Sequence, residues 1–221
     1  AQRETFLSFY RLPSSAVIDS RLSCYTYLNM VEPDMTTVPE QKYILFAGKI
    51  SKYKGVEYLL EAMKKVHETF PDIKLVVAGG GKYHFDISGY AALPYIDIRN
   101  RFIPDEELVA LMKKTQFMVC PYTDATQSGV IMSSFTFGTP VIATRVGGLP
   151  EMLGNGKYGM LVKEKDTDAL YLGISSLLSD EEQLADYRRE IAKDYTSDGY
   201  LSWKTIAEEL RESYLQMASR K

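Results

Sequence analysis

A basic loop at positions 47–55 carries residue types that could hold a diphosphate. It reads Ala-Gly-Lys-Ile-Ser-Lys-Tyr-Lys-Gly, with three lysines between Gly48 and Gly55. Lys49 and Lys54 are expected to offer two ammonium groups, each charge-assisted contact contributing about 1.5–3 kcal/mol. The alternative is a solvated basic turn, and spacing by itself does not choose between the two.

A second loop, at 122–130, reads Tyr-Thr-Asp-Ala-Thr-Gln-Ser-Gly-Val and is expected to lead into a helix. Ser128 or Thr126 suits the N-cap of that helix. Gly129 lets a ligand approach the backbone, and the unpaired N–H groups of a helix start favour a phosphate or sugar hydroxyls. The alternative is ordinary capping without a ligand.

The elements that must position these loops alternate along the chain. Apolar runs predict strands at 43–46, 74–78, 95–98, 117–120, 141–144 and 158–162, with helical periodicity between most of them. Residues 16–18 suggest a further short strand. Strands that alternate with helices predict an α/β fold, a Rossmann-like doubly wound parallel sheet of about six strands.

Such a sheet binds ligands outside the carboxyl ends of its strands. The loops that follow the expected strands, at 47–55, 79–84, 102–105 and 121–129, should therefore lie together. Three units are expected in the chain: a linker and leading segment at 1–40, a Rossmann-like ligand-binding domain at 41–195, and a C-terminal tail helix at 196–221.

Composition excludes several classes of protein. A net charge of −3 gives no reason to expect binding to nucleic acid. No Cys/His cluster has metal-ligand spacing, so no protein-held metal is predicted. Two cysteines, no apolar run near 18 residues and no signal peptide favour a cytoplasmic location. Because the chain begins at Ala1 rather than Met, we expect it to be part of a longer protein.

Four segments in order resemble the C-terminal, donor-binding domain of the retaining GT-B glycosyltransferases called group 1 or family 4. They are 46–55, 75–81, 101–108 and 138–151, the last reading Gly-Thr-Pro-Val-Ile-Ala-Thr through Gly-Gly-Leu-Pro-Glu. The stretch around Trp203 is similar to the tail that crosses back to the other domain in that family.

The resemblance implies a hexosyltransferase-type reaction in polysaccharide biosynthesis. A UDP-, GDP- or ADP-sugar would lie between two domains, with no cofactor and no metal, and its sugar would pass to an acceptor with retention of configuration. Lys49 and Lys54 match the pair that neutralises the departing diphosphate. The implied donor-binding residues are Gly48, Ile103, Thr126, Gln127, Ser128, Gly129, Val130 and Ser133. The acceptor-binding N-terminal domain would be missing here, and the full-length protein is expected to touch a membrane surface.

One departure from the family pattern concerns its pair of glutamates. Counting back from Gly138 places the second at Ser133 and the first at Ala125, and neither is acidic. Ser133 is expected to contact the ribose in place of the second glutamate. Asp124, Thr126 or Gln127 is expected to replace the first. The departure leaves two alternatives open: a degenerate, non-catalytic GT-B module that binds a partner, or another enzyme such as a sugar-nucleotide epimerase or a phosphorylase-like protein.

Overall fold

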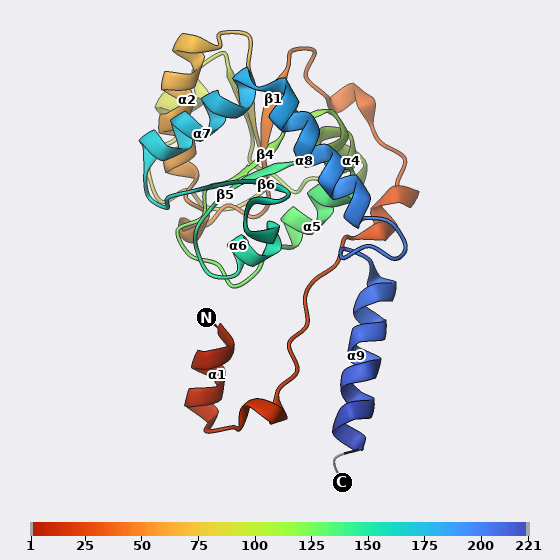
Figure 1. Cartoon of the computed structure of the whole chain (residues 1–221). Coiled ribbons are helices and arrows are strands. Elements are labelled where there is room, and N and C mark those ends of the chain that lie inside the picture. The colour runs from red at the N-terminus through yellow and green to blue at the C-terminus, as the bar shows by residue number, and fades with distance from the viewer. Residues whose placement is uncertain (1, 220–221) are drawn as a thin grey trace.

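The computed structural model describes residues 2–219 and centres on one parallel sheet (Figure 1). Six strands lie in the order β3-β2-β1-β4-β5-β6, and all the pairings are parallel. The predicted doubly wound α/β fold is therefore confirmed. The strands are β1 (Tyr43–Ala47), β2 (Lys74–Ala78), β3 (Ile96–Arg99), β4 (Met118–Cys120), β5 (Val141–Thr144) and β6 (Gly159–Val162).

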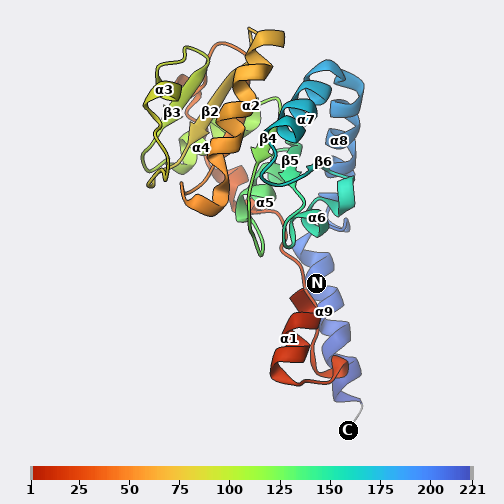
Figure 2. The ribbon, with the colours of Figure 1, turned by 90° about the vertical axis from the view of Figure 1, so that its left-hand side faces the viewer.

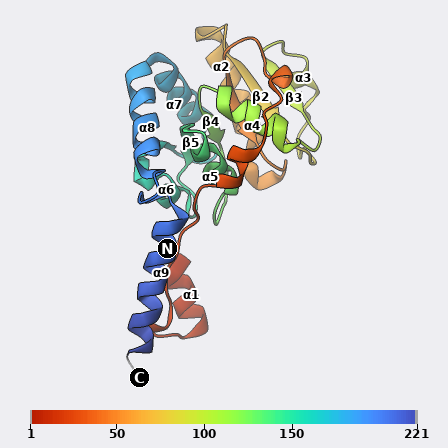
Figure 3. The ribbon, with the colours of Figure 1, turned by 90° about the vertical axis from the view of Figure 1, so that its right-hand side faces the viewer.

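Helices cover both faces of the sheet (Figures 2 and 3). α2 and α7 pack together on one face, and α4 and α5 lie on the other. The central strand β1 is buried along its whole length, which explains its continuous apolar run. The helices of this domain are α2 (Val56–Thr69), α3 (Ser88–Ala91), α4 (Asp105–Lys114), α5 (Gly129–Thr136), α6 (Leu149–Met152), α7 (Thr167–Ser179) and α8 (Glu181–Asp194).

The two ends of the described chain leave the sheet domain together. α1 (Gln2–Tyr10) and α9 (Trp203–Ala218) extend away from it on the same side in all three views. Their bases are tied where Ser23 Oγ donates to the Leu201 carbonyl and Trp203 Nε1 donates to the Cys24 carbonyl, the latter at 2.9 Å. The leading segment and the tail thus form one connected unit beside the domain.

The prediction of a short strand at 16–18 is wrong. Ser14–Ala16 form a 3-10 turn, Val17 after it is extended, and neither residue 17 nor residue 18 belongs to a strand. This segment lies beside α1, where the Val17 carbonyl accepts from Arg3 Nη1 at 3.1 Å. β-branched residues there had suggested a strand, but no sheet edge runs alongside to complete it.

Within residues 2–219, no helix combines the length and the apolar character needed to cross a bilayer.

Candidate functional site at the switch point of the sheet

The strand order reverses between β1 and β4, and the two lysine- and glycine-bearing loops leave the sheet there. A parallel sheet of this order binds ligands at that switch point. The β1–α2 loop and the β4–α5 loop touch directly, since a β-carbon on Gly48 would lie 3.4 Å from Val130 Cγ2. The fold therefore brings together the two loops that carry phosphate-binding chemistry.

The backbone of the first loop is locked against the second. Lys52–Lys54 form a 3-10 turn, and Gly55 ends it in the left-handed conformation at φ 61°. A β-carbon on Gly55 would overlap the carbonyl oxygen of Pro121, so only glycine allows this approach. The backbone N–H of Thr123 also donates to the Tyr53 carbonyl at 2.7 Å. These contacts fix where Lys54 enters the site.

Lys54 is buried at the switch point, with 8% of the residue exposed. Its ammonium lies 3.6 Å from the centre of the Tyr122 ring and 5.0 Å from that of Tyr53. Among the described residues no carboxylate pairs with it. Burial lowers the pKa of Lys54, whereas the ring face favours its charged form. A buried cation held by aromatic rings is ready to pair with an incoming anion.

The start of α5 supplies backbone donors beside this cation. Ser128 is the N-cap, as one of the two predicted capping residues, but its side chain does not bond to the helix. Ser128 Oγ instead lies 3.2 Å from the hydroxyl of the fully buried Tyr122. The N–H groups of Gly129 and Val130 have no partner anywhere in the described chain. Free N–H groups at a helix start attract anions.

Tyr122 joins the two halves of the site. Its ring contacts the Lys54 ammonium, and its hydroxyl lies within hydrogen-bond distance of Ser128 Oγ. Its carbonyl accepts a hydrogen bond from Thr144 Oγ1 at 2.5 Å. Burial raises its pKa well above the usual value, so it stays a neutral phenol. Sequence reasoning missed this residue, although a tyrosine directly after Pro121 at the end of a buried strand was a usable signal.

A cavity of about 380 Å³ opens on the β2 side of Gly48. Lys49 and Ile103, both predicted site residues, line it together with the exposed Phe102 ring. Gly79 and Gly80 also line it, and a β-carbon on Gly79 would overlap the Gly48 carbonyl oxygen, so only glycine allows the two loops to approach here. Lys49 is exposed and has no ionic partner among residues 2–219.

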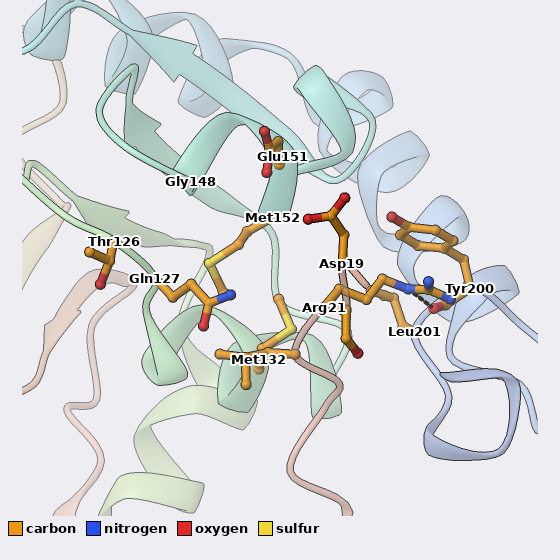
Figure 4. A pocket seen from close by; sticks show the side chains of 12 residues that line it. Asp19, Arg21, Thr126, Gln127, Met132, Gly148, Glu151, Met152, Tyr200 and Leu201 are labelled. Atoms are coloured by element: carbon orange, nitrogen blue, oxygen red, sulfur yellow. Dashed lines mark hydrogen bonds between the residues drawn. The ribbon is translucent and has the colours of Figure 1, made fainter. Parts of the chain in front are cut away.

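A second cavity, of about 300 Å³, lies where the β4–α5 loop meets α6 (Figure 4). Thr126 and Gln127 line it from the β4–α5 loop, and Glu151 and Met152 line it from α6. The leading segment and the tail close the remaining side with Asp19, Ser20, Arg21, Leu22, Tyr200 and Leu201.

The last of the predicted donor-binding residues, Ser133, lies on the same helix. Ser133 lies one turn into α5 with 6% of the residue exposed, and its Oγ donates to the Gly129 carbonyl at 3.1 Å. Its expected contact with a ribose stays a prediction. In the described part of the chain, no three His, Cys, Asp or Glu side chains gather in a group that could hold a metal ion.

The family model for glycosyl transferases of group 1 matches residues 34–194. This chain belongs to that family. An uncharacterized glycosyltransferase of Methanocaldococcus jannaschii is 31% identical over 180 residues, which make up 79% of this chain and 45% of that protein. A D-inositol 3-phosphate glycosyltransferase of Corynebacterium urealyticum is 31% identical over 186 residues, covering 78% of this chain and 42% of its own length. This group 1 chain therefore spans less than half the length of these two relatives.

Solved structures identify the fold of this glycosyl transferase domain. Anabaena HepE, solved in complex with UDP, matches with a TM-score of 0.67 at 18% identity, over 80% of this chain and 49% of that one. Together with the other structural neighbours, this shows that the sheet domain is one Rossmann-like half of a GT-B fold. The resemblance of the four sequence segments to group 1 glycosyltransferases is confirmed.

Proposed function

We propose that this domain binds a nucleoside-diphosphate sugar at the β1/β4 switch point and serves as the donor-binding half of a glycosyltransferase. The observation that carries the proposal is Lys54, a buried ammonium without a carboxylate partner, set between Tyr122 and the start of α5. A cation is costly to bury without a counter-ion, and proteins keep such arrangements where a ligand supplies the negative charge.

Each part of the donor has a place on this surface. The diphosphate lies between Lys54 and the free N–H groups of Gly129 and Val130, with Lys49 reaching it from the exposed side of the β1–α2 loop. The base enters the cavity beside Ile103 and Phe102. Ser133 is one turn along α5 from those N–H groups, in reach of the ribose once its bond to Gly129 is exchanged.

The catalytic role follows from this placement. When the sugar leaves, negative charge grows on the diphosphate, and the preset ammonium groups of Lys49 and Lys54 stabilise it. Two cations can thus supply the charge that a metal ion provides in other transferases, and we propose that transfer needs no metal. By resemblance to family 4, we further propose transfer of a hexosyl group with retention of configuration, in polysaccharide biosynthesis and on the cytoplasmic side of a membrane.

We also propose that a second domain of the full-length protein covers α1 and α9. Both helices project from the sheet domain (Figures 1 and 3). They carry large exposed apolar side chains. Phe9 is 78% exposed on α1, and Tyr214 is 64% exposed on α9 next to the exposed Leu215. Clustered apolar side chains of this kind mark an interface. The acceptor site, and any contact with a membrane, would belong to that domain.

Calorimetric titration of the 221-residue chain with UDP, GDP and ADP tests the donor site, first without and then with magnesium. The proposal expects saturable binding of one nucleotide in the absence of metal, and an affinity that magnesium does not raise. Absence of binding to all three nucleotides, or binding only with magnesium, would contradict it. The degenerate-module alternative predicts no binding under either condition.

A further inference from the structure

We infer that Glu107 is a positioning residue for the nucleobase, acting through Arg101 on the loop at 100–104 that distinguishes one base from another. This inference rests on the proposed function, because it assumes that the base enters the cavity of about 380 Å³ beside Gly48. Glu107 lies in the first turn of α4, directly after the loop that lines this cavity. It is buried, and a buried carboxylate is costly unless it is paired, so its partners indicate its role.

The loop at 100–104 joins β3 to α4 and has few backbone bonds of its own. β3 is an edge strand, so the sheet flanks it only on the side of β2. On that side the N–H of Gly81 donates to Asn100 Oδ1 at 2.9 Å. The N–H groups of Phe102 and Ile103 make no hydrogen bond within residues 2–219. Both residues line the cavity, so its shape depends on whatever else holds the loop.

Glu107 supplies that anchor. Its side chain is 5% exposed and meets the Arg101 guanidinium through two bonds, Nη2 to Oε1 at 2.8 Å and Nη1 to Oε2 at 2.7 Å. Arg99 Nη1, at the end of β3, donates to the same Oε1 at 2.9 Å. Arg101 Nη1 also donates to the Phe102 carbonyl at 3.2 Å. One carboxylate therefore joins the end of β3, the loop and the start of α4.

The form of this network favours positioning over net stability. The desolvation cost of a buried ion pair offsets most of its attraction, so such a pair contributes little to the free energy of unfolding. A planar guanidinium that meets a carboxylate through two bonds does fix the orientation of both groups. Burial on its own would raise the pKa of Glu107, but the bonds from Arg101 and Arg99 lower it, so the carboxylate stays ionised near neutral pH.

A fixed loop is what discrimination between bases requires. UDP, GDP and ADP share the ribose and the diphosphate, so only groups beside the base can separate them. The unpaired N–H groups of Phe102 and Ile103 are hydrogen-bond donors on this loop. They match one base and reject another only if the backbone is held to within about 0.5 Å. The diphosphate is bound at Lys54 and α5, so release of the loop should leave its contacts unchanged.

The nucleotide preference of Arg101 variants tests the inference. Titration with UDP, GDP and ADP gives three Kd values, and the ratio of the second lowest to the lowest is the preference. Half of the Arg101 side chain is exposed, so its replacement leaves the core intact. In Arg101→Met the preference should fall at least about 5-fold. Arg101→Lys keeps the charge but cannot form the two-bond pair, and it should lose as much.

Two further variants complete the experiment. Glu107→Gln removes the charge that holds both arginines and should lower the preference as Arg101→Met does. Arg189→Met is the matched control, because it removes an exposed arginine that pairs with Asp186 on α8. It should keep the wild-type preference.

An unchanged preference in Arg101→Met, or equal weakening of all three nucleotides, would overturn the inference while leaving the donor site standing. A wild-type preference in Arg101→Lys would assign the effect to charge and overturn the positioning role. Equal Kd values for the three nucleotides in the wild-type chain would overturn it as well. Failure of the wild-type chain to bind any of the three refutes the proposed function itself, and this inference falls with it.

Discussion

Replacing Lys54 with methionine should stabilise the domain and weaken donor binding in the same variant. Methionine keeps an unbranched apolar side chain beside Tyr122 and Tyr53 while the charge is removed. Burying an ammonium without a carboxylate costs several kcal/mol, of which the Tyr122 ring at 3.6 Å returns about 2 kcal/mol. We therefore expect the free energy of unfolding to rise by about 1 kcal/mol, or about 2–4 °C in Tm for a chain of this size.

The loss of binding should be much larger than this gain in stability. Removing one charge-assisted contact of about 1.5–3 kcal/mol raises the Kd for the preferred nucleotide about 10- to 150-fold. Thermal unfolding followed by circular dichroism and calorimetric titration near neutral pH measure the two effects. Lys52→Met, an exposed lysine in the same turn, is the control and should change both little. A less stable Lys54→Met variant that binds nucleotide as tightly as wild type would refute the reasoning.

Three further predictions concern the same site. Because burial lowers the pKa of Lys54, the ammonium loses its proton at a lower pH than an ordinary lysine. Nucleotide affinity should fall as pH rises through that range. The free energy of unfolding should rise over the same range, because the unfolded state then binds more protons than the folded state. Nucleotide titrations and unfolding experiments in a pH series should show neither trend in Lys54→Met. Tyr122→Phe loses the hydroxyl contact with Ser128, so it should lower the free energy of unfolding in urea by about 1 kcal/mol and change the nucleotide Kd less than about 3-fold. Tyr122→Leu removes the ring that lies against Lys54 and should raise the nucleotide Kd more than about 3-fold. Equal Kd values in the two variants would contradict the role of the ring. Gly147 and Gly138 both have left-handed backbone conformations, but a β-carbon on Gly147 would overlap the Ala125 carbonyl, whereas one on Gly138 would face open space. Gly147→Ala should therefore lower the free energy of unfolding by more than the about 1 kcal/mol expected of Gly138→Ala. Equal losses in the two variants would count against the packing of the two loops.

The sheet could be predicted because its signal is local. Each core strand is a short apolar run followed by glycine or a polar loop, and parallel strands buried on both faces require that pattern. The strand boundaries moved by about one residue, as at β3, which begins at Ile96 rather than Tyr95. The prediction of a strand at residues 16–18 failed because β-branched residues favour a strand only where a neighbouring strand exists.

The site was predicted in its loops but not in its contacts. Spacing placed Lys49 and Lys54 at a strand end, yet it could not show that Lys54 is buried on Tyr122 while Lys49 is exposed. That difference depends on Gly55 packing against Pro121, across 66 residues of sequence. Glu151 was predicted only as the end of the segment at 138–151 that resembles the family, because nothing local indicates that α6 faces the β4–α5 loop.

A structure of the chain with its preferred nucleoside diphosphate bound tests the central claim most directly. The account predicts the diphosphate at the switch point, in contact with the Lys54 ammonium and the N–H groups of Gly129 and Val130, with the base beside Ile103. Such a structure would also show whether Ser133 reaches the ribose. A diphosphate bound away from Lys54 and the start of α5 would contradict the account.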